Sequence, residues 1–168
     1  MANCIFEFEW EPLVKNEVFR WCDHRDSSHG GPHMEQVASN TKLLLQALFA
    51  TPGSDLYIKF AHDLPCLASC CVLSAWLHDV IDHKYNDVSR EELSQFLIIN
   101  FPDFADTILN VISRVSFSKE RSQRLLDPDL LAWLDVLGEF GMLVRDIVSD
   151  ADKLEVFCSF SVIFISML

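Results

Sequence analysis

The sequence predicts an all-α protein, and three observations support this prediction. Apolar residues recur every three or four positions along most of the chain, as they do on one face of an amphipathic helix. No segment shows the alternation of apolar and polar residues that is typical of a half-buried strand. The 168 residues include only five Gly and six Pro, fewer than a turn-rich β-sandwich needs.

The first third of the chain predicts two helices and the breaks that separate them. A helix is expected over 11–22, with Pro12 at a position suited to the first turn. The polar, Gly-rich residues 23–32 predict a loop, and a long helix is expected from Pro32 to about Ala50. The Thr-Pro-Gly-Ser sequence that follows ends this helix.

The middle of the chain predicts a central buried helix and a capped one. Residues 55–81 are apolar and helix-like, with an interruption or kink near Pro65. After a polar loop over 82–88, Ser89 and Glu92 have the spacing of a capping box, so a helix is expected to run from there to about Asn100.

The last part of the chain predicts further helices of the same kind. A helix restarts at Pro102 and continues to about Val115. Asp127-Pro128 caps another helix, and residues 138–141, which begin and end with Gly, interrupt it before a last helix over about 142–155.

Length and charge restrict the domain count and the partners. A chain of 168 residues is one domain's worth of protein, so we expect a single domain over 1–168. With 25 Asp and Glu against 13 Lys and Arg, the net charge of −12 repels nucleic acid and anionic lipid. We expect neither as a partner, and the sequence leaves the oligomeric state open.

The sequence shows no segment that resembles an export or membrane signal. Residues 1–10 carry two Glu and no basic residue, and no apolar run reaches the roughly 18–20 residues of a transmembrane helix. The six Cys form no CxxC pair and are expected to be reduced, mostly buried small hydrophobes. A cytoplasmic location is the expectation that follows.

Three sites combine residue types suited to metal binding: His33, His78-Asp79 and Asp150-Ala151-Asp152. The residues before His78 are apolar, and a charged Asp79 directly after them is costly unless it points at a partner. Adjacent helical residues lie roughly 100° apart, so both side chains can converge on one ion near the helix end. Imidazole with carboxylate suits Mn²⁺, Fe²⁺, Co²⁺, Zn²⁺ or Mg²⁺, and the sequence leaves the metal's identity open.

In this chain order, these residues resemble the HD-domain family of metal-dependent phosphohydrolases. The resemblance is to a subgroup of small single-domain proteins. The stretches AWLHDVIDHKY, SFSK and DADKLE of this chain are similar to motifs of that subgroup. The four matching blocks are residues 29–37, 75–85, 116–119 and 150–155. They lie in order within about residues 15–155, which is most of the chain.

The resemblance implies an all-helical fold around one divalent metal ion, held by His33, His78, Asp79 and an Asp of the last block. In such families an activated water attacks a phosphorus atom. Similar proteins act on nucleotides, so we expect a metal-dependent phosphohydrolase of nucleotides or related phosphate esters. Asp79 and Asp82 are then candidate catalytic residues, and His83 is a candidate proton donor to the leaving group.

The residues alone do not decide between Asp150 and Asp152 as the last ligand. Two positions on a helix differ by roughly 200°, and the apolar face leaves both Asp residues on its flanks. The family pattern selects Asp152 and gives Asp150 the role of orienting a ligand or water. His29 is expected at the mouth of the pocket, because the Gly-Gly-Pro sequence after it prevents a helical face shared with His33.

A local excess of positive charge provides candidate phosphate ligands. Arg114, Lys119, Arg121 and Arg124 stand against the single acid Glu120, in a chain that is otherwise strongly acidic. These cations either complement a solvated helix end or form a phosphate cradle beside the metal. In the second reading Arg114, Lys119 and Arg121 bind phosphate, and Lys84, six positions after His78, reaches it from the loop.

The tail over 156–168 departs from the resemblance. It contains no Gly and no charged residue, whereas a Gly-containing stretch and a further helix follow DADKLE in the similar proteins. We expect the tail to continue the last helix or to fold back beside Asp152, because its apolar side chains favour burial. The alternative function is a non-catalytic or truncated HD module that binds a nucleotide or a protein partner.

Overall fold

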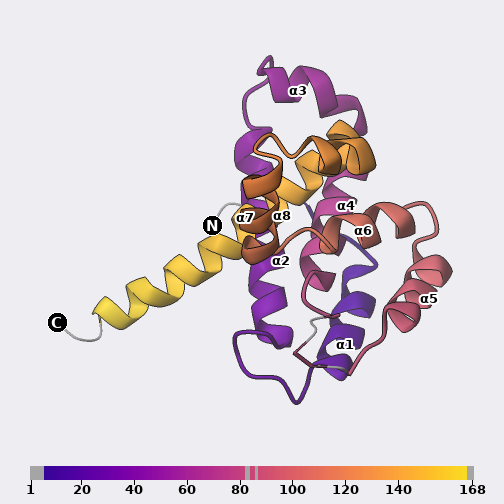
Figure 1. Ribbon diagram of the computed structural model, residues 1–168, viewed down its shortest axis with the longest axis vertical. Helices are drawn as coiled ribbons and strands as arrows, with labels where there is room; N and C mark the ends of the chain where they lie inside the picture. The colour runs from indigo at the N-terminus through magenta and orange to yellow at the C-terminus, as the bar shows by residue number, and fades with distance from the viewer. Residues whose placement is uncertain (1–5, 82–83, 86, 166–168) are drawn as a thin grey trace.

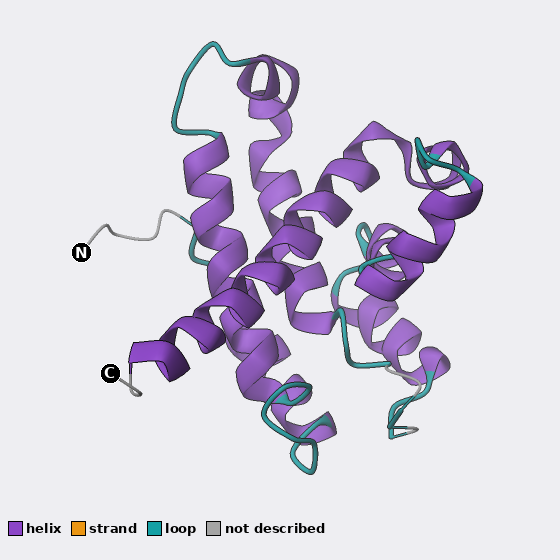
Figure 2. Ribbon diagram, turned by 60° about the vertical axis from the view of Figure 1, so that its left-hand side comes forward, coloured by secondary structure: helices purple, strands orange, loops and turns teal. Residues whose placement is uncertain are grey.

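Helices form all the regular structure in the described part of the chain, which confirms the predicted all-α class (Figure 2). The computed structural model describes residues 6–81, 84–85 and 87–165, and the side chains of these residues except Phe117 and those after Glu155. No strand occurs among these residues. The elements are α1 (Glu11–Trp21), α2 (Gly31–Leu48), α3 (Asp55–Phe60), the 3₁₀ turn η1 (Ala61–Asp63), α4 (Leu64–Leu77), α5 (Arg90–Asn100), α6 (Ala105–Ile112), α7 (Phe117–Leu126) and α8 (Leu131–Ile165).

The core forms where α2, α4 and α8 pack against one another, with α1 and α6 on its flanks (Figure 1). Helix α4 is apolar on all sides, and ten of its 14 residues are buried. Trp76, the largest fully buried side chain, lies near its C-terminal end. The predicted central helix is therefore confirmed, and the residue that follows it, His78, emerges between α2 and α8.

Most of the predicted boundaries agree with the structure. The interruption near Pro65 is real, because α3 and η1 precede α4 and Pro65 lies in the first turn of α4. Ser89 caps α5 by accepting a hydrogen bond from the Glu92 amide at 3.0 Å. The Glu92 carboxylate accepts a hydrogen bond from the indole of Trp21, so it also ties α5 to α1.

One helix starts later than predicted, and another was not predicted. Helix α6 begins at Ala105, three residues after Pro102, because a turn over 102–104 comes first. Helix α7 was not predicted: it is strongly polar, so its sequence lacks the apolar stripe from which the other helices were predicted.

Helix α8 bends at the predicted interruption and is longer than predicted. Gly138 has φ 62°, a left-handed conformation that favours glycine, and it separates two helical segments within α8. Beyond Glu155 the helix continues to Ile165, so the tail extends the last helix, as one of the two expectations had it. In Figure 1 this final part runs away from the other helices.

One described segment has the length and apolarity of a membrane span. It covers Asp55–Leu77, and 61% of its most apolar window is buried inside the fold. Burial of this kind is what the central helix of a helical core shows, so the segment is weak evidence for a membrane span.

The cysteines whose side chains are described carry unreactive thiols in the core, with one exception. Cys22, Cys70 and Cys71 are buried, and Cys66 is exposed. Burial raises the pKa of the Cys22 thiol to about 11 and that of Cys70 to about 12. These thiols stay protonated and pack as small hydrophobic groups, as predicted. Cys4 and the side chain of Cys158 lie outside the described part of the chain.

Candidate metal centre

Three residues from three helices meet at one end of the core. His33 lies in the first turn of α2, His78 directly follows α4, and Asp152 lies on α8. Each offers a ligand atom, and these atoms lie within 4.8 Å of one another. The Nε2 atoms of the two histidines are 3.2 Å apart, and Oδ1 of Asp152 lies 3.5 Å from the first and 3.8 Å from the second.

The hydrogen bond of His78 fixes its tautomer. Its Nδ1 lies 2.8 Å from the backbone oxygen of Ala75, and a carbonyl oxygen can only accept. Nδ1 therefore carries the proton, and the lone pair of Nε2 points toward His33 and Asp152. Histidine ligands of metal ions are commonly oriented by such a bond from the other ring nitrogen.

The surroundings of His33 favour its neutral form, and the Glu155 carboxylate lies near its Nδ1 atom. Burial lowers the pKa of His33, and the nearby His78 lowers it further. Oε2 of Glu155 lies 3.4 Å from Nδ1 of His33, close enough to favour a proton on that nitrogen although the pair lacks hydrogen-bond alignment. Because Nε2 of His78 carries a lone pair, Nε2 of His33 donates the 3.2 Å hydrogen bond between the two rings. A bound cation would take the place of this proton, and the proton of His33 would then lie on Nδ1, on the side of Glu155.

This donor set fits a divalent transition metal. Two imidazole nitrogens and one carboxylate oxygen form the ligand set of open, catalytic zinc-type sites, in which a further position remains for water or substrate. Asp152 is the acid that the structure brings to the two histidines, whereas Asp150 lies about two-thirds exposed and pairs with Lys153 at 3.3 Å.

Two contacts position helix α2, one with α1 and one with α8. A side chain at Gly31 would meet the ring of Phe19 at 2.8 Å, so only glycine lets the start of α2 approach α1 this closely. About two helical turns after His33, the buried side chain of Asn40 donates a hydrogen bond of 3.1 Å to the backbone oxygen of Ala151. This bond fixes α8 to α2 one residue before Asp152.

Arg25 holds the end of α4, and the sequence analysis did not identify it. Its buried guanidinium donates to the backbone oxygens of Asp79 at 2.7 Å and Val80 at 2.6 Å. It also forms two hydrogen bonds with the Asp87 carboxylate, at 2.8 and 2.6 Å. Both oxygens belong to the turn that follows α4 and carries His78 and Asp79. The one available signal was an arginine in a polar loop, which does not by itself indicate burial.

Asp87 completes this arrangement, and we call Arg25, Asp87 and the two carbonyls the arginine clamp. Burial alone would raise the pKa of Asp87, but the hydrogen bonds and the charge of Arg25 outweigh it and lower the pKa. The clamp thus holds a charged pair beside the turn that carries His78 and Asp79.

A cavity of about 490 Å³ opens beside His78 and Asp152, and we call it the metal cavity. His78, Asp79 and Asp152 line it, so Asp79 faces the same space although its carboxylate is outside the closely spaced group of three. His29 and Lys84 line it as well, with Nζ of Lys84 3.3 Å from Nε2 of His29. Asp82 and His83, the other predicted catalytic residues, lie outside the described residues.

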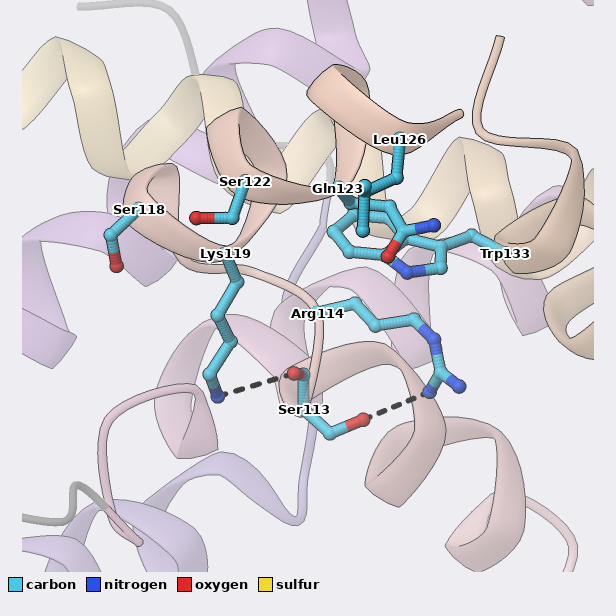
Figure 3. Close-up of a pocket in the computed structure, with 8 residues that line it drawn as sticks. All are labelled: Ser113, Arg114, Ser118, Lys119, Ser122, Gln123, Leu126 and Trp133. Carbon is cyan, nitrogen blue, oxygen red and sulfur yellow. Dashed lines mark hydrogen bonds between the residues drawn. The ribbon is translucent and has the colours of Figure 1, made fainter. Parts of the chain in front are cut away.

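The predicted basic cluster divides between two cavities. Lys119 lines the metal cavity, together with Arg90, which the sequence analysis did not identify. Arg114 lines a neighbouring cavity of about 500 Å³, which we call the second cavity (Figure 3). Arg121 is exposed on α7 and is absent from the linings of both cavities.

Three basic residues that line the two cavities, Arg90, Arg114 and Lys119, differ from most others in the described structure because they form no ion pair there. Most of the chain's lysines and arginines pair with a carboxylate within 4 Å: Lys15, Arg20, Arg25, Lys42, Lys59, Arg124, Arg145 and Lys153. Arg90, Arg114 and Lys119 have no carboxylate partner of this kind among the described residues. Arg121 has none either, so three of these four cations line the two cavities and the fourth is exposed outside both.

Comparison with known proteins adds no relative. No protein-family model, no curated protein and no solved structure matches this chain. The chain's own residues and their geometry are therefore the basis for assigning a function.

Proposed function

We propose that this protein is a metal-dependent phosphohydrolase that acts on nucleotides or related phosphate esters. One observation carries the proposal: His33, His78 and Asp152 bring two imidazoles and a carboxylate within 4.8 Å of one another, and the last two line a cavity together with Lys84, Arg90 and Lys119. A metal-binding donor set beside several cations suits a substrate with phosphate groups.

The residues have separate tasks in this proposal. His33, His78 and Asp152 would hold the ion, which when bound supplies a water of lowered pKa and polarises a phosphoryl oxygen. Lys84, Arg90 and Lys119 would bind and orient the remaining phosphate oxygens. Asp79, on the same cavity wall, can accept a proton from the attacking water.

The electrostatics of the chain support a polyanionic substrate. Acidic residues outnumber basic ones by 25 to 13, so most cations find a carboxylate within the fold. Arg90, Arg114, Lys119 and Arg121 are exceptions among the described residues, and two of them, Arg90 and Lys119, line the metal cavity. Phosphate oxygens would give these side chains the charge-assisted hydrogen bonds that carboxylates give the others.

A metal-dependent assay tests the proposal. The purified protein is stripped of metal, supplied in turn with Mn²⁺, Co²⁺, Fe²⁺, Zn²⁺ or Mg²⁺, and assayed for phosphate or pyrophosphate release from a panel of nucleotides and a simple phosphate monoester. We expect turnover with at least one metal and its loss in Asp152→Asn. The control Asp135→Asn changes an exposed acid on the same helix and should retain activity.

The outcomes separate the two function classes. Metal-dependent turnover that Asp152→Asn abolishes supports the enzyme. If the protein binds metal and nucleotide but releases no phosphate from any substrate, the non-catalytic binding module is the correct alternative.

A further inference from the structure

The end of α7 and the start of α8 expose more large apolar side chains than any other region of the described structure. Leu125 and Leu126 are 82% and 85% exposed, and Leu131, Leu134 and Val136 follow in the first turns of α8. We call these five residues the apolar patch. Residues of both helices line the second cavity, so the two helices meet here (Figure 3). Isolated exposed apolar residues are common, whereas a group of them is typical of an interaction surface.

One face of α7 is turned to the second cavity and another to α8. Ser122, Gln123 and Leu126 line the cavity. On the other face, Oε2 of Glu120 lies 2.5 Å from Nη2 of Arg145, a buried residue of α8. Residues three or four positions apart share a helical face, so these two faces hold α7 against the fold.

The third face of α7 makes no contact of this kind among the described residues. Arg121 and Leu125, four positions apart, share this face, and both are exposed and absent from the linings of the two cavities. Asp129, four positions after Leu125, is exposed in the turn between α7 and α8. Neither Arg121 nor Asp129 forms an ion pair with a residue that the structure describes. A cation and an acid without partners therefore lie before and after an exposed leucine.

The charge of this segment suits a second copy of the chain. Residues 119–129 contain three basic and three acidic side chains, so the segment is neutral, whereas the whole chain carries −12. Two copies of so acidic a chain repel each other, and a neutral surface is where they approach most easily. The order of the charges is also self-complementary. Because Arg121 and Asp129 are equally far from Leu125 in the sequence, an antiparallel arrangement brings each arginine to the aspartate of the other copy.

We propose that two copies of this protein associate through the apolar patch, with their α7 helices antiparallel about a two-fold axis near Leu125. The leucines of the two copies pack at the centre, and Arg121 and Asp129 form two ion pairs at the rim. A patch of this size corresponds to a small interface, so we expect a weak dimer with a Kd of about 1–100 µM. No residue of the patch lines the metal cavity, so the dimer is independent of the proposed activity.

Sedimentation equilibrium of the full chain, at concentrations that span the expected Kd, tests the apolar centre. Leu125→Ser should raise the dimer Kd at least about 30-fold, because a symmetric interface loses two leucines at once. Ile99→Ser is the matched control, since Ile99 is 77% exposed on α5, outside the patch. Its Kd should equal that of the parent.

A charge exchange tests the antiparallel arrangement. Arg121→Asp and Asp129→Arg each place like charges at both rim contacts and should raise the Kd about 5- to 30-fold. The double variant Arg121→Asp/Asp129→Arg restores opposite charges, keeps the net charge at −12 and should recover the Kd of the parent. Both residues are exposed, so the fold should tolerate the changes, and circular dichroism of each variant checks this.

Three results would overturn the inference. A parent that sediments as a monomer at every concentration has no such interface. A dimer that Leu125→Ser and both single charge reversals leave unchanged forms through another surface, such as the apolar tail over 156–168. If the single reversals weaken the dimer and the double variant does not recover it, the two copies do not meet in the antiparallel arrangement.

Discussion

Nε2 of His33 and Nε2 of His78 lie 3.2 Å apart, although 45 residues separate them in the chain. His33 begins one core helix and His78 ends another, and Asp152 approaches both from α8. The three helices that form the core therefore also form the candidate metal centre. Changes that loosen their packing near this end should affect metal binding as well as stability.

The arginine clamp should control metal affinity without touching the metal. Arg25→Met removes the donors to the carbonyls of Asp79 and Val80, so the turn that carries His78 loses its support. We expect metal affinity to fall about 10- to 100-fold, the range typical of residues that orient a ligand. Arg20→Met, at an exposed arginine nearby, is the control. Equal affinity in Arg25→Met and the parent would refute this role.

Asp87 should make stability depend on pH in the acid range. Its pKa in the folded protein is below the ordinary value of 3.8, so its charged form stabilises the fold at higher pH. This contribution is complete above the ordinary value and is lost as the pH falls through the lowered pKa. The free energy of unfolding of Asp87→Asn should therefore be below that of the parent at neutral pH, and the difference should shrink below pH 3.8. A difference that stays constant down to the acid unfolding limit would contradict this.

Asn40 should contribute to both stability and the position of Asp152. Asn40→Ala removes the side-chain hydrogen bond to the oxygen of Ala151, which should cost about 0.5–1.5 kcal/mol in the free energy of unfolding. Asn16→Ala changes an exposed residue of α1 and should cost less than about 0.5 kcal/mol. Denaturant unfolding of the two variants gives the comparison. A similar small cost in both would show that the α2–α8 hydrogen bond is dispensable.

The structure divides the basic cluster, and kinetics can test this division. Lys119 lines both cavities, so Lys119→Ala should raise KM for a nucleotide by about 10- to 150-fold, the value of a charge-assisted hydrogen bond. Arg121 is exposed outside both linings, so Arg121→Ala should change KM less than about threefold. If Arg121→Ala raises KM more than Lys119→Ala does, the interpretation from the sequence, in which Arg121 also binds phosphate, is correct.

Sequence patterns were sufficient for the fold class and for much of the site. The apolar run of α4 predicted a central buried helix, and the break near Pro65 and the Ser89 cap followed from local chemistry. The resemblance to a known family implied four ligands, and the structure brings three of them, His33, His78 and Asp152, into one closely spaced group that leaves out Asp79. Periodicity alone left Asp150 and Asp152 undecided, and the structure brings Asp152 to the histidines.

The residues that support the ligands were not predictable from the sequence. Arg25, Asn40 and Glu155 act through contacts between distant segments, with Arg25 binding carbonyls more than 50 residues away. The division of the basic cluster also depends on how α7 packs, and the polar sequence of α7 carries no apolar stripe that would reveal it. Local patterns do not specify such long-range contacts.

Metal binding by single-ligand variants tests the central claim most directly. Metal-free protein is titrated with Co²⁺ while the visible absorption is recorded, and bound metal is counted after dialysis. We expect about one equivalent per chain for the parent and for Asp135→Asn, and a loss of affinity above about 100-fold for His78→Ala and for Asp152→Asn, since each removes one of three ligands. If His78→Ala and Asp152→Asn bind Co²⁺ as the parent does, with unchanged spectra, these residues do not form the metal centre.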